Sequence, residues 1–188
     1  MAVIRTEELN KNLVNEVIEE GKLVLGEAVV RSIKACYQCG TCTGSCPSGR
    51  RTAYRTRKVL RKVLFGLDDV LDSDDIWYCT TCYTCYERCP RDVKITEIIK
   101  TLRNIATKKG NMALAHRKTA SYVLRFGHAV PANKQIVELR GKLGLPAKSP
   151  TAQFSEKDLE EVRTLIKELK FDELIGFDWE KMDLKEKQ

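Results

Sequence analysis

Eight cysteines, grouped in two runs of identical spacing, are the residues of this 188-residue chain whose types and positions point to chemistry. The runs are Cys36-Tyr-Gln-Cys39-Gly-Thr-Cys42-Thr-Gly-Ser-Cys46-Pro47 and Cys79-Thr-Thr-Cys82-Tyr-Thr-Cys85-Tyr-Glu-Arg-Cys89-Pro90. Both follow C-x2-C-x2-C-x3-C-P, and together they use every cysteine. Three thiolates at this spacing wrap one short loop around three corners of an iron–sulfur cube. The runs therefore predict two [4Fe–4S] clusters, which store and pass single electrons.

The fourth cysteine of each run is expected to reach across to the other cluster. In two-cluster ferredoxins with this spacing the fourth cysteine ligates the other cluster. The proline after it fixes the backbone and removes an N–H donor, which helps the chain turn away. The expected ligands are Cys36, Cys39, Cys42 and Cys89 for cluster 1, and Cys79, Cys82, Cys85 and Cys46 for cluster 2. This crossing ties the runs together and keeps the clusters close, as an electron relay requires.

Two structural zinc sites are the alternative for eight cysteines. Zinc sites prefer two C-x2-C arms separated by a longer loop, whereas each run here places four cysteines within eleven residues. His116 and His128 are expected to be surface or packing residues, since cysteine fills every cluster position. The spacing therefore favours clusters over zinc.

Residues beside the cysteines have two interpretations. Gly40 and Gly44 are expected to allow tight turns and to let N–H groups approach cluster sulfurs. The aromatic residues that flank the runs either shield the clusters from water or form a small core. They are Tyr37, Trp77, Tyr78, Tyr83 and Tyr86.

The elements that must position the runs are expected to be helices. Apolar residues recur at helical spacing before, between and after the runs. They are Leu9, Leu13, Val14, Val17 and Ile18, with Gly21 after them; Ala53, Leu60, Val63, Leu64 and Leu67; and Ile95, Ile98, Ile99, Leu102, Ile105 and Ala106. Residues 23–33 fit either a strand or a helix, and residues 72–75 resemble a helix cap.

Further helices are expected over 112–126 and 133–143, and Ser155 with Asp158 resembles a capping box that opens a last helix. Because no strand-rich pattern occurs, the predicted fold is mainly α, an α-helical ferredoxin flanked by N- and C-terminal helices. The expected domains are an N-terminal extension (1–30), the two-cluster domain (31–146), and a C-terminal helix with a tail (147–188). The tail from Phe171 suits either a docking segment or a solvated end.

The charge distribution allows a second class of function. The net charge is +7, and residues 31–66 carry nine Lys and Arg and no acidic residue. A basic stretch of this kind occurs in nucleic-acid-binding proteins, but no recognition motif accompanies it. We expect no nucleic-acid partner and expect the cations to offset cluster charge, which raises the reduction potential.

The sequence lacks the motifs of several other enzyme classes and the signals that would direct the chain to or across a membrane. It contains no G-x-G-x-x-G, G-x-S-x-G or H-E-x-x-H motif and no adjacent cysteine pair of the CCG type. No apolar run approaches the roughly 20 residues that span a bilayer, and the N-terminus does not resemble a secretory signal. These observations predict a cytoplasmic protein with no membrane span.

The runs and their neighbours resemble the C subunit of heterodisulfide reductase over about residues 30–145. The resemblance is carried by the whole sequence of the first run and by Ile76-Trp-Tyr together with the second. It implies a non-catalytic iron–sulfur protein that relays electrons from the flavin (A) subunit to the catalytic (B) subunit. With its CCG domains, that catalytic partner reduces the CoM-S-S-CoB heterodisulfide in methanogenesis. The eight cysteines are the functional residues that carry over.

The resemblance also implies a larger assembly with a hydrogenase or a formate dehydrogenase, in which flavin-based electron bifurcation reduces ferredoxin as well. One alternative is the dicluster subunit of another oxidoreductase, similar to fumarate reductase, glycolate oxidase or a sulfur-metabolising complex. The other is a nucleic-acid-binding protein with structural clusters.

Overall fold

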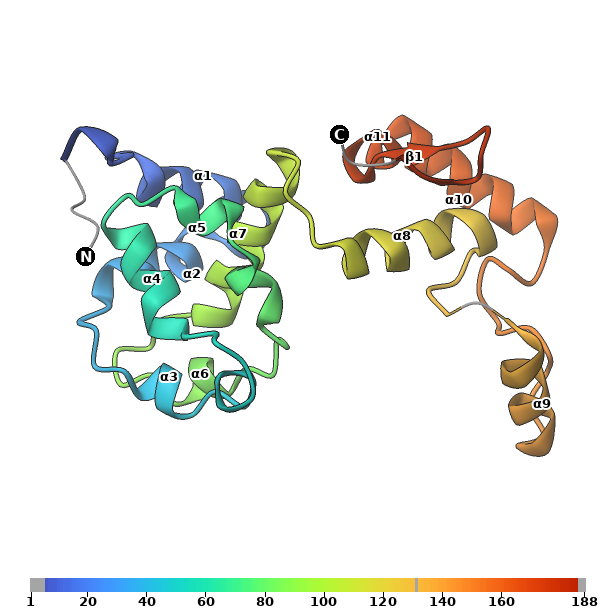
Figure 1. Cartoon of the computed structure of the whole chain (residues 1–188), viewed down its shortest axis with the longest axis horizontal. Helices are drawn as coiled ribbons and strands as arrows, with labels where there is room; N and C mark the ends of the chain where they lie inside the picture. Colours follow the sequence, from blue (N-terminus) through green and yellow to red (C-terminus); the bar gives the residue numbers. More distant parts are fainter. Residues whose placement is uncertain (1–5, 131, 186–188) are drawn as a thin grey trace. The chain divides into compact units, whose positions relative to one another are not determined.

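The chain is mainly helical, as expected, and forms two compact units (Figure 1). The computed structural model describes residues 6–130 and 132–185. The first unit extends to Asn111 and contains, in chain order, the 3₁₀ helix Thr6–Glu8, α1 (Leu13–Leu25), α2 (Glu27–Arg31), the 3₁₀ helix Ser32–Ala35, α3 (Thr41–Gly44), the 3₁₀ helix Ser48–Arg50, α4 (Thr56–Leu64), α5 (Asp69–Asp72), the 3₁₀ helix Asp74–Tyr78, α6 (Thr84–Glu87) and α7 (Ile95–Lys108).

The core of the first unit is formed by the apolar faces of α1, α4 and α7. Six apolar residues of α7, from Ile95 to Ala106, are buried because they recur every three or four residues. Leu13 of α1 and Leu60 of α4 are buried in the same cluster of side chains. Each fully buried side chain of this size contributes about 1.5–3 kcal/mol. The three helices predicted by periodicity are confirmed, and they form the frame that carries the cysteine runs.

The segment before the first run is helical rather than a strand. Helix α1 does not end at Gly21, as the sequence suggested, but continues to Leu25, and α2 follows directly. Gly21 is buried where α1 meets α2 and α7: a Cβ built there would lie 2.3 Å from Val30 Cγ1 and 2.9 Å from Thr101 Oγ1. Glycine is therefore needed here for close helix packing and not to end a helix.

Gly21→Ala is expected to lower the free energy of unfolding of the first unit. Forcing a methyl group into a packed contact costs about 1–3 kcal/mol, which outweighs the roughly 1 kcal/mol that alanine gains over glycine in a helix. Anaerobic thermal unfolding measures the change. Gly141→Ala in α9 (Lys134–Lys142) is the matched control, because apart from its chain neighbours and the backbone of its own helix no described atom lies within 4 Å of a Cβ at Gly141. Equal stabilisation by both substitutions would contradict the close packing.

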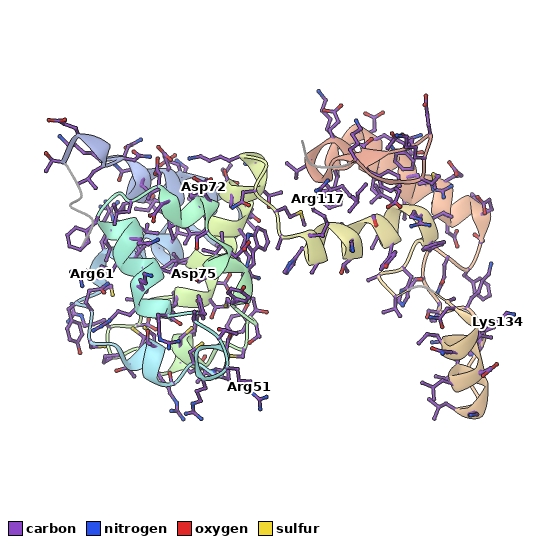
Figure 2. All side chains as sticks on the ribbon, in the orientation of Figure 1. Arg51, Arg61, Asp72, Asp75, Arg117 and Lys134 are labelled. Carbon is purple, nitrogen blue, oxygen red and sulfur yellow. The ribbon has the colours of Figure 1, made fainter. Side chains whose placement is uncertain are left out.

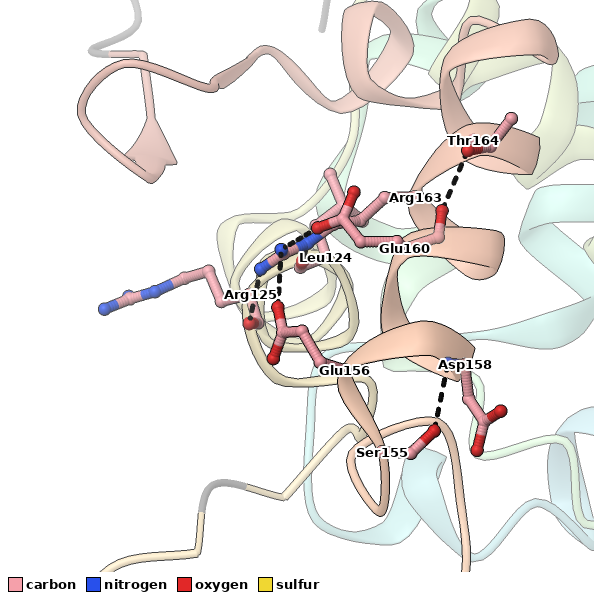
Figure 3. Close-up of polar contacts among 8 residues, drawn as sticks. All are labelled: Leu124, Arg125, Ser155, Glu156, Asp158, Glu160, Arg163 and Thr164. Carbon is pink, nitrogen blue, oxygen red and sulfur yellow. Dashed lines mark hydrogen bonds and ion pairs between the residues drawn. The ribbon is translucent and has the colours of Figure 1, made fainter.

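The second unit begins at Met112 and contains α8 (Leu114–Phe126), α9, α10 (Glu156–Glu168), α11 (Phe171–Ile175), and the antiparallel strands β1 (Phe177–Asp178) and β2 (Asp183–Leu184). The expected cap of α10 is present, since Ser155 Oγ accepts a hydrogen bond of 3.1 Å from the backbone N–H of Asp158 (Figure 3). In the same view Arg163 donates to the backbone oxygens of Leu124 and Arg125, each at 3.1 Å. One arginine thus fixes α10 to the end of α8.

The tail from Phe171 packs on its own unit. Ile175 and Phe177 are buried with Leu124 and Ile166, which shows that residues 171–185 are not a frayed, solvated end. Arg117 of α8, labelled in Figure 2, is also buried and donates to the backbone oxygens of Ile175 at 2.9 Å and Lys185 at 3.2 Å. Most of the large apolar residues that suggested docking therefore contribute to an internal core.

The units divide the chain differently from the ranges expected from the sequence. The boundary lies between Asn111 and Met112, whereas the expected two-cluster domain ran from 31 to 146 with residues 1–30 as an extension. Helix α1 belongs to the first core because its apolar stripe packs against α4 and α7. Helix α8 belongs to the second core through Leu124. Residues 1–5 and 186–188 of the expected ranges lie outside the described residues.

Candidate metal centre

The two cysteine runs adopt the same backbone conformation. The second residue after the first cysteine has a positive φ in both runs, 64° at Gln38 and 51° at Thr81. The fourth residue after that cysteine does so as well, with 87° at Gly40 and 62° at Tyr83. A four-residue helix then begins in each run, α3 in the first and α6 in the second, and these two helices are in contact (Figure 1). The two runs thus share their backbone conformation as well as their cysteine spacing.

The position of Gly40 is taken by Tyr83 in the second run, where a left-handed conformation costs about 1–2 kcal/mol. Side-chain contacts offset this cost. The Tyr83 hydroxyl donates to Glu97 Oε1 at 2.9 Å and accepts from Lys100 Nζ at 3.1 Å. Gly40 thus makes the tight turn that its residue type predicted, whereas Gly44 lies inside α3.

Equivalent polar groups contact equivalent sulfurs in the two runs. Thr41 Oγ1 lies 3.4 Å from Cys39 Sγ, and Thr84 Oγ1 lies 3.5 Å from Cys82 Sγ. After the fourth cysteines, the backbone N–H of Gly49 donates to Cys46 Sγ at 3.4 Å, and that of Val93 donates to Cys89 Sγ at 3.3 Å. Donors aimed at sulfur favour the thiolate, which is the form that binds iron.

Burial divides the cysteines into inner and outer positions. Cys42, Cys46 and Cys85 are buried, whereas Cys39 and Cys82, the second cysteine of each run, are exposed. In the thiol form, burial raises the pKa of Cys42 to about 11 and also raises that of Cys85. Hydrogen bonds with the threonine two residues later lower the pKa of Cys39 and of Cys82. Each run therefore presents one easily ionised sulfur to the surface and keeps another inside.

Each fourth cysteine lies beside the other run. A small cavity is lined by Cys46 of the first run together with Cys79, Cys82 and Cys85 of the second. The hydroxyl of Ser48 donates to the backbone oxygen of Tyr78 at 2.6 Å, which holds the end of one run against the start of the other.

The counterpart for the first run is the neighbourhood of Tyr37. The thiolate of Cys39 and a hydrogen bond with it raise the pKa of Tyr37, and the thiolate of Cys89 adds to the shift. Cys89 of the second run therefore lies near Tyr37 of the first run.

The residues present suit iron–sulfur clusters. All eight cysteines are free of disulfides. The cavity that brings Cys46 to Cys79, Cys82 and Cys85 offers four soft thiolate donors, which are the ligands of [4Fe–4S] clusters. The N–H and hydroxyl groups that contact sulfur are the kind of outer groups that orient ligands and tune a metal centre.

The tyrosines beside the runs do not form the core. Tyr37 is 61% exposed, and Tyr78 and Tyr83 are also exposed, whereas Trp77 packs partly buried against the first core. The sequence missed the aromatic residue that is buried at the site, Tyr54, which is 1% exposed and lines the cavity with Cys46. It stands among the arginines of the basic stretch, eight residues after Cys46, where its place in the sequence does not mark it as part of the site.

Arg103 is a second residue that the sequence did not single out. Its guanidinium, on α7, donates to the backbone oxygens of Ile76 at 2.9 Å and Trp77 at 3.3 Å, and to that of Cys79. It also lies over the Trp77 ring. Its place in the sequence of α7 gives no sign of this role, because the carbonyls that it binds lie 24 to 27 residues earlier in the chain.

Comparison with known proteins identifies the family. The profile of the 4Fe-4S dicluster domain matches residues 32–93. The iron-sulfur C subunit, copy 2, of CoB–CoM heterodisulfide reductase from Methanocaldococcus jannaschii is 92% identical over 186 residues, which cover 99% of this chain and 100% of that protein. The C2 subunit of the H(2)/formate:CoB-CoM heterodisulfide,ferredoxin reductase of Methanococcus maripaludis is 69% identical, over 98% of this chain and 100% of that protein.

The chain belongs to the family of heterodisulfide reductase C subunits. A more distant member, the C subunit of the ferredoxin:CoB-CoM heterodisulfide reductase of Methanosarcina mazei, is 44% identical over 84% of this chain and 98% of that protein. As a member of this family, the chain is an electron-transferring iron–sulfur component of an oxidoreductase complex and holds two [4Fe–4S] clusters. The predicted cofactors and the predicted α-helical ferredoxin class are thereby confirmed.

The basic stretch of this heterodisulfide reductase component borders the first run. Arg57 of α4 lies over Gly40, and its Nη1 donates to the backbone oxygen of Gln38 at 3.4 Å. Arg51 and Arg61, labelled in Figure 2, are exposed on the first unit. A guanidinium as close to the run as that of Arg57 would offset the negative charge of a bound cluster. Across residues 6–130 and 132–185, no helix is long and apolar enough to cross a membrane.

Proposed function

We propose that this chain relays single electrons from a flavin-containing subunit to a catalytic subunit, which reduces the CoM-S-S-CoB heterodisulfide. The observation that carries the proposal is the exposure of one cysteine in each run, Cys39 and Cys82. One accessible sulfur on each cluster provides one place where electrons arrive and another where they leave. The chain itself contributes no catalytic residue to the disulfide reaction.

We further propose the ligand sets. Cys36, Cys39, Cys42 and Cys89 hold cluster 1, and Cys79, Cys82, Cys85 and Cys46 hold cluster 2. When bound, the clusters accept and release one electron each. The chain fixes the thiolates with the short helices α3 and α6, places N–H donors at Cys46 and Cys89, and keeps water from the buried sulfurs. Reduction of a disulfide consumes two electrons, so each turnover requires two passages through the relay.

The electron donor proposed for the whole complex is hydrogen or formate, through a hydrogenase or a formate dehydrogenase. The relative that is 69% identical carries hydrogen, formate and ferredoxin in its name. The relative that is 44% identical carries ferredoxin as the donor. The greater similarity to the former supports a cytoplasmic complex in which flavin-based bifurcation also reduces ferredoxin.

Anaerobic purification of the native complex, with mass spectrometry of its subunits, tests the partners. A flavin chain and a CCG-domain chain are expected. A membrane anchor or a different flavoprotein would move the chain to another oxidoreductase complex, and bound nucleic acid without redox partners would overturn the relay.

The relay itself is tested in that complex with Cys42→Ala and Cys46→Ala combined, which removes one proposed ligand from each cluster. Heterodisulfide reduction driven by hydrogen or formate is expected to fall at least tenfold. Reduction driven by a viologen dye that feeds the catalytic subunit directly is expected to persist, because the disulfide chemistry takes place there. Unchanged hydrogen- or formate-driven reduction after loss of both clusters would refute the relay.

A further inference from the structure

Two buried hydroxyl groups at the second cluster site have no hydrogen-bond partner within the described residues. Tyr54 and Thr56 are each 1% exposed and line the cavity formed with Cys46, Cys79 and Cys85. Neither Tyr54 Oη nor Thr56 Oγ1 forms a hydrogen bond there. Buried hydroxyls in native proteins are almost always paired, so a partner outside the polypeptide is expected.

The walls of this cavity indicate what the partner is. Tyr54 and Thr56 share the lining of this cavity with the thiols of Cys46, Cys79 and Cys85. The sulfurs of a bound cluster accept hydrogen bonds, and each hydroxyl supplies one donor. Donors and acceptors are thus complementary across the cavity.

A third hydroxyl of the lining shows the same kind of contact already formed. Thr96 Oγ1, on α7, lies 3.6 Å from Cys85 Sγ. Thr96 therefore already presents a hydroxyl to a sulfur in this cavity. Tyr54 and Thr56 line the same cavity, and their two hydroxyls remain free to donate hydrogen bonds.

The positions equivalent to Tyr54 and Thr56 after the second run carry no hydroxyl. Helices α4 and α7 each follow a cysteine run, and Thr56 is the first residue of α4 as Ile95 is of α7. Counting from these helix starts, Tyr54 corresponds to Val93 and Thr56 to Ile95. Val93 and Ile95 are buried but apolar. The two hydroxyls therefore distinguish the second site from the equivalent positions after the second run.

We propose that Tyr54 Oη and Thr56 Oγ1 donate hydrogen bonds to the sulfurs of cluster 2 and raise its reduction potential. Reduction adds one electron to the cluster, no bond forms or breaks, and both protons stay on their hydroxyls. Donors stabilise the more negative, reduced state more strongly than the oxidised one. The inference rests on the proposed ligand set of cluster 2 and does not depend on the electron partners.

The test is a redox titration of the purified holo-complex, followed by electron paramagnetic resonance, for Tyr54→Phe combined with Thr56→Val. We expect the reduction equilibrium of one cluster to weaken about tenfold, which is a downward shift of about 59 mV for one electron. The other cluster is expected to keep its potential. Tyr122→Phe in α8, in the second unit, is the control and should shift neither cluster.

Two further variants separate hydrogen bonding from packing. Thr56→Ser keeps the hydroxyl and is expected to retain the parent potential, whereas Thr56→Val alone shifts it downward. In deuterated buffer, Tyr54→Phe is expected to remove one exchangeable-deuteron coupling from the spectrum of the same cluster. Unchanged potentials, equal shifts of both clusters, or a Thr56→Ser shift equal to that of Thr56→Val would each overturn the inference. A complex that fails to relay electrons but shows these shifts would refute only the proposed function.

Discussion

Replacing Cys46 and Cys79 together with alanine is expected to remove one cluster and leave the other intact, although the two residues lie in different runs. Replacing Cys42 and Cys46 together, two residues of the same run, is expected to disrupt both clusters. The reason is the proposed crossing of the runs: Cys46 lines one cavity with Cys79, Cys82 and Cys85, and Cys89 lies near Tyr37 of the first run. Alanine is used because serine still offers an oxygen ligand.

Iron and sulfide analysis after anaerobic purification distinguishes the two outcomes. The variant with Cys46 and Cys79 replaced should retain about four irons per chain and the spectroscopic signal of one [4Fe–4S] cluster. The variant with Cys42 and Cys46 replaced should retain well below about four irons per chain, since each cluster loses a ligand. Ser45→Ala is the matched control, because Ser45 directly precedes Cys46 and its hydroxyl donates to the backbone oxygens of Thr41 and Cys42. If the same-run pair instead kept one intact cluster while the other pair disrupted both, each run would hold its own cluster and the crossed ligand sets would be wrong.

The cluster motifs could be recognised from the sequence because their ligands are local. Seven residues hold three cysteines of each run, and both runs share one local conformation, with positive φ at Gln38 and Thr81. Helices such as α7 were equally clear, because a stripe of isoleucine and leucine at helical spacing specifies both the element and its buried face.

What the sequence did not reveal depends on contacts between distant residues. Arg117 looks like an ordinary basic residue of α8, yet it is buried against carbonyls near the C-terminus. Gly21 resembled a helix end because its packing partners, Val30 and Thr101, are identified only once α1 has met α2 and α7. Tyr54 was hidden in the same way, since its cavity is completed by cysteines of the second run. Local patterns therefore located the clusters, and the fold determined their surroundings.

Removing iron from the holo-protein with a chelator is expected to unfold the cysteine runs and to leave the second unit folded. Helices α3 and α6 have four residues each, far below the length at which a helix is stable by itself. Gln38, Thr81 and Tyr83 hold left-handed conformations that cost about 1–2 kcal/mol each. At a site of this kind the free energy of iron–thiolate bonding contributes to the stability of the folded state. Removing the iron therefore removes the interactions that keep the two cysteine runs folded.

Hydrogen exchange with mass spectrometry, measured before and after anaerobic chelation, follows both units in one experiment. Amides of α3, α6 and the loops around them are expected to lose at least tenfold protection, while α1 and α7 lose less because their core of Leu13, Leu60 and Ile98 contains mainly aliphatic contacts. The amides of α8 and α10 serve as the internal control, since their core of Leu124, Ile166, Ile175 and Phe177 contains no cysteine. Full protection of the runs without iron would mean that the polypeptide alone specifies the cluster sites, and joint unfolding of α10 would mean that the two units do not fold independently.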